Sequence, residues 1–258
     1  MIKLLLFKLV IYYITIMDEL TTPFNTIKIA ILDYDDTIFP TTHIQNLFTH
    51  GQYISEEFSY MLKLIEIKIE QIIRILTINN YNIYIVTNAS LTWLDYSFNT
   101  HIPNILKMLN KYNVKIISAN HLYSNIYPNN PLEWKKNVFN NIINNHLHQN
   151  NEDYNYYDNC ILNKCIFPLT SFICKNDYTT IDVISIGDSI IDQESSNSLR
   201  NGNLPVIVKF VKFEDNPSIS LIIHQLDIII NNIDQLFLTK INIDITSEQF
   251  GLKSCETQ

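Results

Sequence analysis

Glycine is scarce in this chain of 258 residues, which contains only Gly51, Gly187, Gly202 and Gly251. Loops that bind nucleotide phosphates need closely spaced glycines, as in Gly-x-x-x-x-Gly-Lys and Gly-x-Gly-x-x-Gly, and neither pattern occurs. The Gly-x-Ser-x-Gly turn that presents a nucleophilic serine is absent too. The sequence therefore excludes a P-loop, a dinucleotide-binding loop and a serine hydrolase of that type.

Positive charge is scarce as well, with Arg74 and Arg200 the two arginines and a formal net charge of −8. A protein that binds duplex nucleic acid normally carries a basic surface that displaces counterions from the phosphates. No basic stripe is visible in the sequence, so we expect no duplex nucleic acid partner. The 47% apolar and 12% aromatic content is ample for a packed interior and excludes wholesale disorder.

Cysteine is limited to four residues, three of which lie between residues 160 and 174, shortly after His146 and His148. A zinc site is one interpretation of this grouping, but the Cys-x-x-Cys pair typical of such sites is absent. We therefore expect reduced thiols, with a structural zinc as the alternative.

Residues 1–16 are almost wholly apolar, with Lys3 and Lys8 as the charged exceptions. This run is shorter than the roughly 20 residues that a membrane-spanning helix needs, and no small-residue cleavage site follows it. We interpret residues 1–24 as an N-terminal extension outside the folded domain, with Met17 as an alternative start. A cytoplasmic protein is expected. The alternative is membrane contact or targeting through residues 1–16.

Short apolar runs alternate with segments of helical period along the rest of the chain. The long segment 56–78 carries apolar residues on one helical face, and shorter helices are expected at 91–98, 102–111, 132–145 and 218–236. The runs expected to form strands are 28–33, 82–87, 114–118, 181–187 and 205–210. Most are apolar throughout, which is typical of parallel strands covered on both faces. The alternation predicts an α/β fold, a Rossmann-like, doubly wound and mainly parallel sheet.

Polar residues that could take part in catalysis or ligand binding follow several of these strands. Asp33, Asp35 and Asp36 crowd the end of the first strand, where like charges raise one another's pKa unless a cation lies between them. A solvated turn would also explain acids at this position, since aspartate is common in turns. Ligands of open α/β sheets bind at the carboxyl ends of the strands, so the other strand ends decide between these interpretations.

The second strand closes on Thr87 and Asn88, and the fourth is followed by Asp188 and Asp192. Between them, at an expected helix start, come two adjacent lysines, at positions 135 and 136. Each feature alone has a plain structural explanation, but their joint order along the chain favours a functional site. A response-regulator receiver uses similar residues in another order, with the lysine last, and is therefore rejected.

The pattern Asp33-x-Asp35-x-Thr37, then Thr87, then a lysine, then Gly187-Asp188-x-x-x-Asp192 resembles the four ordered motifs of the haloacid dehalogenase (HAD) superfamily. The resemblance spans about residues 28–215. A closer resemblance, to a group of eukaryotic and viral-type members, rests on a Thr-Asn turn followed by a Trp-containing helix, a strand ending Ile-Ile-Ser-Ala, and Pro-x-x-Trp-Lys. That alignment favours Lys135 over Lys136 as the functional lysine.

The resemblance implies a Mg²⁺-dependent phosphomonoester hydrolase that works through an aspartyl-phosphate. Asp33 would be the nucleophile and Asp35 the general acid and base. Thr37 would support the loop, while Asp36 is expected to be a solvated turn residue. The phosphoryl group would be held by Thr87, Asn88 and Lys135. The Mg²⁺ would be bound by Asp33, the main-chain carbonyl of Asp35 and Asp188, with Asp192 as a further ligand or as the residue that orients a metal-bound water.

Two alternatives to hydrolysis remain open from the sequence. Retention of Asp35 favours phosphoester chemistry, but a phosphotransferase would retain it too. A catalytically inactive HAD-like binding or interaction module is the other alternative, because a fold does not establish a function.

The domain plan that follows is a HAD-like catalytic domain over residues 25–245, with an insertion at about 144–180 and a polar tail over 246–258. Only about 50 residues separate Thr37 from Thr87, and a similar span separates Thr87 from Lys135. We therefore predict a minimal or absent cap and an open site. Such a site suits an exposed phosphoryl group, on a small molecule or on a macromolecule.

Overall fold

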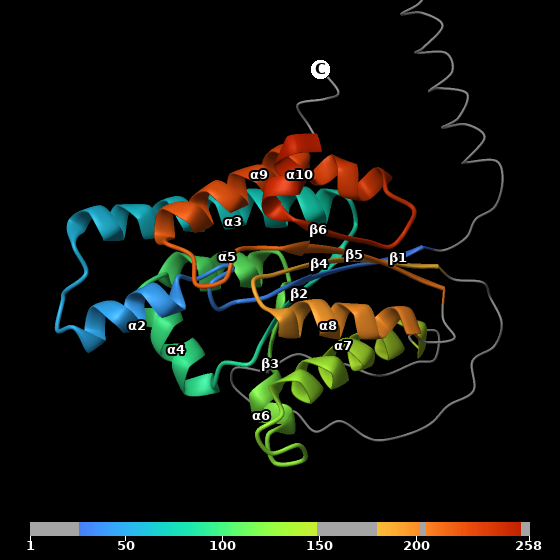
Figure 1. Ribbon diagram of the computed structural model, residues 1–258, viewed down its shortest axis with the longest axis horizontal. Helices are drawn as coiled ribbons and strands as arrows, with labels where there is room; N and C mark the ends of the chain where they lie inside the picture. The colour runs from blue at the N-terminus through green and yellow to red at the C-terminus, as the bar shows by residue number, and fades with distance from the viewer. Residues whose placement is uncertain (1–25, 149–179, 202–204, 254–258) are drawn as a thin grey trace, which may run out of the picture.

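The computed structural model describes residues 26–148, 180–201 and 205–253. Six parallel strands form one sheet with the order β3-β2-β1-β4-β5-β6 (Figure 1). This arrangement confirms the α/β, Rossmann-like parallel sheet predicted from the sequence. The strands are β1 (Ile27–Leu32), β2 (Asn82–Thr87), β3 (Lys115–Ser118), β4 (Ile181–Gly187), β5 (Val206–Lys212) and β6 (Ile243–Thr246).

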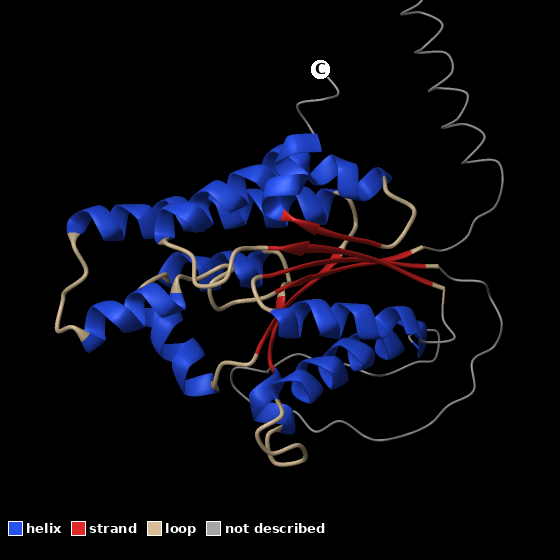
Figure 2. Cartoon of the chain, in the orientation of Figure 1, coloured by secondary structure: helices blue, strands red, loops and turns tan. Residues whose placement is uncertain are grey.

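Helices cover both faces of the sheet, which lies between them as the red layer in Figure 2. The helices α3, α5, α9 and α10 lie on one face, and α6, α7 and α8 lie on the other (Figure 1). Their bounds are α2 (Thr41–Thr49), α3 (Glu56–Ile78), α4 (Leu91–Thr100), α5 (Pro103–Lys111), α6 (Ala119–Tyr123), α7 (Pro131–His148), α8 (Ile190–Ser198), α9 (Ile219–Leu238) and α10 (Ser247–Lys253). No helix of the described ranges is both long and apolar enough to cross a membrane.

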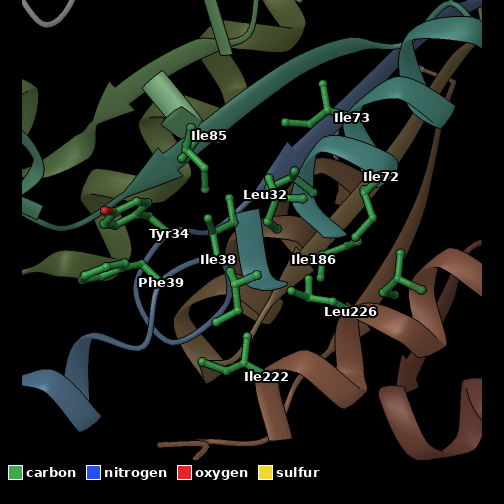
Figure 3. Packing of buried hydrophobic residues seen from close by; sticks show 14 of the residues in the cluster. Leu32, Tyr34, Ile38, Phe39, Ile72, Ile73, Ile85, Ile186, Ile222 and Leu226 are labelled. Carbon is green, nitrogen blue, oxygen red and sulfur yellow. The ribbon is translucent and has the colours of Figure 1, made fainter. Parts of the chain in front are cut away.

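The strands are mostly apolar because successive side chains point to opposite faces of the sheet, and helices cover both faces. Along β1, Ile29 and Ile31 belong to the core on the α7 side, and Ala30 and Leu32 belong to the core under α3 and α9. Figure 3 shows Leu32 among side chains of α3, α9 and β4 in that second core. The alternation thus builds two cores from one strand.

Helix α3 confirms the predicted segment 56–78 to the residue. Its seven buried side chains are those of the apolar face predicted from the sequence. The side chain of Ser55 accepts a hydrogen bond of 3.1 Å from the backbone N–H of Phe58, which satisfies a donor that the first turn would otherwise leave free.

The boundaries that differ most from expectation lie at the predicted insertion and near the end of the chain. Residues 144–148, expected to open the insertion, are instead the last residues of α7, and the remainder, 149–179, lies outside the described residues. Residues 246–253 are not a loose tail, since β6 pairs with β5 and α10 follows it. Phe250, only 2% exposed, lies in the core. The predicted extension 1–24 also lies outside the described residues.

The described segments after β1 and β2 contain no domain separate from the sheet. Helices α2 and α4 lie near the carboxyl ends of β1 and β2, on the left of Figure 1, and α3 and α5 return along one face. The short spacings after Thr37 and Thr87 are therefore occupied in part by helices α2 and α4, which contribute buried residues to the core.

Candidate functional site

Three aspartates meet at the carboxyl ends of the adjacent strands β1 and β4. The strands pair with Leu32 opposite Ile186, and the backbone N–H of Asp33 donates to the Ile186 carbonyl at 2.9 Å. One carboxylate oxygen from each of Asp33, Asp188 and Asp192 lies within 4.8 Å of the others. Asp33 is only 5% exposed. Three carboxylate oxygens this close together could hold a metal ion.

Lys135, in the first turns of α7, reaches into this cluster. Its Nζ forms ion pairs with Oδ1 of Asp33 and Oδ1 of Asp192, and the residue is 3% exposed. The neighbouring Lys136 instead lies near Glu133 at 3.5 Å, with 27% of its side chain exposed. The lysine brought to the acidic cluster is therefore Lys135, as the motif alignment favoured.

The pKa values of the cluster reflect an excess of buried negative charge. Burial, and then the charge of Asp192, raises the pKa of Asp33 well above its usual range, with Lys135 acting in the opposite direction. Burial and the charge of Asp192 also raise the pKa of Asp188, to about 7. Burial lowers the pKa of Lys135, but the two carboxylates beside it outweigh this effect and raise it. A bound divalent cation would relieve the repulsion among the carboxylates.

The second acid of the first motif, Asp35, lies beside this cluster and is held by three donors. Its Oδ1 accepts hydrogen bonds from Thr41 Oγ1 at 2.5 Å and from Trp93 Nε1 at 3.1 Å, and its Oδ2 accepts one from Thr87 Oγ1 at 2.8 Å. Tyr34, between the two acids, is buried in the core against Phe39 (Figure 3). Because Tyr34 points into the core, Asp33 and Asp35 on either side of it both lie at the site.

The supporting residues predicted from the sequence also reach the site. Thr37 Oγ1 donates to Asp188 Oδ1 at 3.4 Å, which connects the β1 loop to the β4 loop. The side-chain amide of Asn88 donates to the Pro131 carbonyl at 3.2 Å, at the first residue of α7, while its buried Oδ1 has no partner. Asn88 therefore lies where the end of β2 meets the helix that carries Lys135.

Asp36 was expected to be a solvated turn residue, and this expectation is wrong. Asp36 is buried, has a φ of 55°, and accepts hydrogen bonds from the backbone N–H of Thr42 at 2.9 Å and from the Thr42 hydroxyl. These bonds satisfy a free donor in the first turn of α2, a role that a turn-forming aspartate fits. Burial raises its pKa above the usual range.

Gly187 is the glycine that the site requires. A Cβ at this position would lie 2.5 Å from Cγ of Asp192, a distance that non-bonded carbons do not tolerate. The Asp192 carboxylate is in turn fixed by Ser189, whose backbone N–H donates to Asp192 Oδ2 at 3.2 Å in a capping box at the start of α8. The absence of a side chain at 187 thus lets Asp192 reach back over the end of β4.

Sequence reasoning missed several residues that complete the site. Thr41 and Ser189 carried no periodic signal, and Trp93 was noted in the motif pattern without a role. Lys212, at the end of β5, was also missed. Its Nζ donates to the main-chain carbonyl of Asp188 at 2.6 Å and pairs with Asp215 at the same distance. The strand expected over 205–210 ended two residues before β5 does, so Lys212 was not recognised as a residue of the strand end.

Comparison of the chain with protein-family models, with curated proteins and with solved structures finds no match. The resemblance to the HAD superfamily therefore rests on the ordered motifs alone.

Proposed function

We propose that this chain is a Mg²⁺-dependent phosphomonoester hydrolase of the HAD type with Asp33 as the nucleophile. The observation that carries the proposal is the buried contact of Lys135 with Asp33 and Asp192, within a cluster of three carboxylates and beside Asp35. A phosphate monoester is a dianion, so an attacking carboxylate needs compensating positive charge close by. Lys135 supplies part of that charge.

Asp33, the main-chain carbonyl of Asp35, Asp188 and Asp192 would hold the Mg²⁺, which would supply the remaining positive charge at the phosphoryl oxygens. Thr87 and Asn88 would orient those oxygens from the end of β2. These assignments use residues from β1, β2, β4, α7 and α8, which the parallel sheet brings to one edge.

In the first step, a carboxylate oxygen of Asp33 forms a bond to phosphorus. The bond from phosphorus to the leaving oxygen breaks, and that oxygen takes a proton from Asp35. In the second step, a water attacks phosphorus and gives a proton to the Asp35 carboxylate. The bond to Asp33 then breaks, which releases phosphate and restores both acids.

The substrate is proposed to carry an exposed phosphoryl group, because the described segments after β1 and β2 form no separate domain over the site. Small phosphate esters and phosphorylated macromolecules both meet this condition.

The test is hydrolysis of p-nitrophenyl phosphate by the full chain, with Mg²⁺ and with EDTA, alongside Asp33→Asn. Asp95→Asn, an exposed aspartate on α4, is the matched control for the same chemical change. We expect Mg²⁺-dependent turnover that Asp33→Asn lowers by about 10⁴-fold or more and Asp95→Asn leaves unchanged. If a panel of phosphomonoesters gives no turnover and calorimetry detects no Mg²⁺ binding, the proposal is wrong and a non-catalytic module takes its place.

A further inference from the structure

The three hydrogen bonds to Asp35 are distributed unequally between its two carboxylate oxygens. Oδ1 accepts from both the Thr41 hydroxyl and the Trp93 indole N–H, at 2.5 Å and 3.1 Å. Oδ2 accepts from the Thr87 hydroxyl alone, at 2.8 Å. A carboxylate oxygen has about two lone-pair sites for hydrogen bonds. Oδ1 is therefore saturated, whereas Oδ2 keeps one site open.

The two donors on Oδ1 are themselves held in place. The Trp93 ring packs edge-on against Phe39 at 6.2 Å and beside Tyr96 at 5.9 Å. The backbone N–H of Thr41 donates to the Phe39 carbonyl at 2.8 Å, and Thr41 is buried at the start of α2. Asp35 itself is only partly buried, so its side-chain orientation depends on these neighbours.

We infer that Trp93 and Thr41 are positioning residues that hold Oδ1 of Asp35 and leave Oδ2, beside Thr87, as the oxygen that carries the proton. This inference rests on the proposed function, in which Asp35 acts as general acid and base. As the bond from phosphorus to the leaving oxygen breaks, the proton on Oδ2 passes to that oxygen, which retains the electron pair of the broken bond. Oδ2 accepts a proton back from the attacking water in the second step.

Thr87, at the end of β2, is the residue that donates a hydrogen bond to this oxygen. Its Oγ1 accepts the backbone N–H of Ala89 at 2.9 Å, which fixes the hydroxyl at the end of β2. The oxygen with the open lone pair is thus the one bonded to Thr87, one of the proposed phosphate-binding residues. Trp93 and Thr41, from α4 and α2, donate to the other oxygen of the carboxylate.

Loss of either positioning residue should therefore lower activity by an amount that depends on the leaving group of the substrate. A general acid matters most when the leaving oxygen is strongly basic, as in phenyl phosphate, and least when it is weakly basic, as in 2,4-dinitrophenyl phosphate. Trp93→Phe keeps an aromatic ring but removes the N–H donor. We expect it to lower kcat/KM for phenyl phosphate by about tenfold or more, and for 2,4-dinitrophenyl phosphate by less than about threefold.

Trp134→Phe is the matched control, because it removes the other indole donor of the chain, which binds the Tyr127 carbonyl at 2.6 Å. Any loss that it causes is expected to be equal for the two substrates. Thr41→Val is expected to repeat the Trp93→Phe pattern, and Thr41→Ser, which restores a hydroxyl, to reverse it.

Equal losses on both substrates in Trp93→Phe and Thr41→Val would overturn the positioning role while leaving the proposed hydrolase intact. If Asp35→Asn shows no leaving-group dependence in an otherwise active enzyme, Asp35 is not the general acid and the inference falls with that assignment. Absence of turnover by the unmodified chain on these esters and the wider panel, together with absence of Mg²⁺ binding in calorimetry, would refute the proposed function itself, and the positioning role with it.

Discussion

Removal of the Lys135 charge tests the buried cluster independently of any substrate. Lys135→Met keeps most of the side-chain volume but leaves the carboxylates of Asp33 and Asp192 without their shared cation in a buried site. Breaking a buried ion pair by removing one partner costs about 3–5 kcal/mol. We therefore expect the free energy of unfolding of Lys135→Met to fall by about this amount at neutral pH in Mg²⁺-free buffer.

Lys136→Met is the matched control, since it changes the adjacent lysine in the same helix. Lys136 lies 3.5 Å from Glu133, with 27% and 38% of the two side chains exposed. Pairs of this kind contribute about 1 kcal/mol or less. The contrast between the two variants therefore separates the buried site from the general effect of losing a lysine on α7.

Urea unfolding of the three proteins, followed by circular dichroism in EDTA and again in saturating Mg²⁺, measures the difference. If the free energy of unfolding changes with urea concentration at the same slope in all three proteins, the same amount of surface is exposed on unfolding in each. Mg²⁺ should restore part of the loss in Lys135→Met, because it supplies positive charge to the same carboxylates. Equal destabilisation by the two substitutions would refute the reasoning.

Two further predictions concern pH and the end of the chain. Without Mg²⁺, the raised pKa values of Asp33 and Asp188, the latter about 7, mean that the folded state holds protons that the unfolded state has released. Stability should therefore fall as pH rises from about 4 through 7, and Mg²⁺ should stabilise more at pH 8 than at pH 5. Thermal unfolding from pH 5 to 8 checks this, and the decline should be weaker in Asp188→Asn; a melting temperature that rises with pH would contradict it. Phe250→Ala should destabilise by about 3–5 kcal/mol, as for a large buried aromatic, whereas a change below about 1 kcal/mol in urea unfolding would mean that α10 is not part of the cooperative fold.

Strands and helices could be assigned from the sequence where burial alone determined the pattern of apolar residues. The strands at the centre of the sheet are covered on both faces, so β1 and β4 are mostly apolar. Helix α3 is long enough for its apolar period to be unambiguous. By contrast, β6 has four residues, too few to establish a period, and it is defined by pairing with β5.

Some residues of the candidate site could be predicted from the sequence and others could not. Asp33, Asp188 and Asp192 could be predicted together, because parallel strands bring their carboxyl ends to one edge whatever the details of packing. The burial of Asp36 and the contacts of Trp93 and Thr41 with Asp35 could not be predicted, since they depend on how α2 and α4 pack beside the sheet. Such contacts join residues without any shared periodicity.

The sequence by itself determined the parallel strands other than β6 and the group of acids at their carboxyl ends, because burial on two faces and the order of strand ends are properties of the residue pattern. Only the tertiary structure decided which lysine meets those acids and which oxygen of Asp35 remains open. Adjacent helical residues point about 100° apart, so the packing of α7 against α8 and the sheet turns Lys135 inward and leaves Lys136 near the surface.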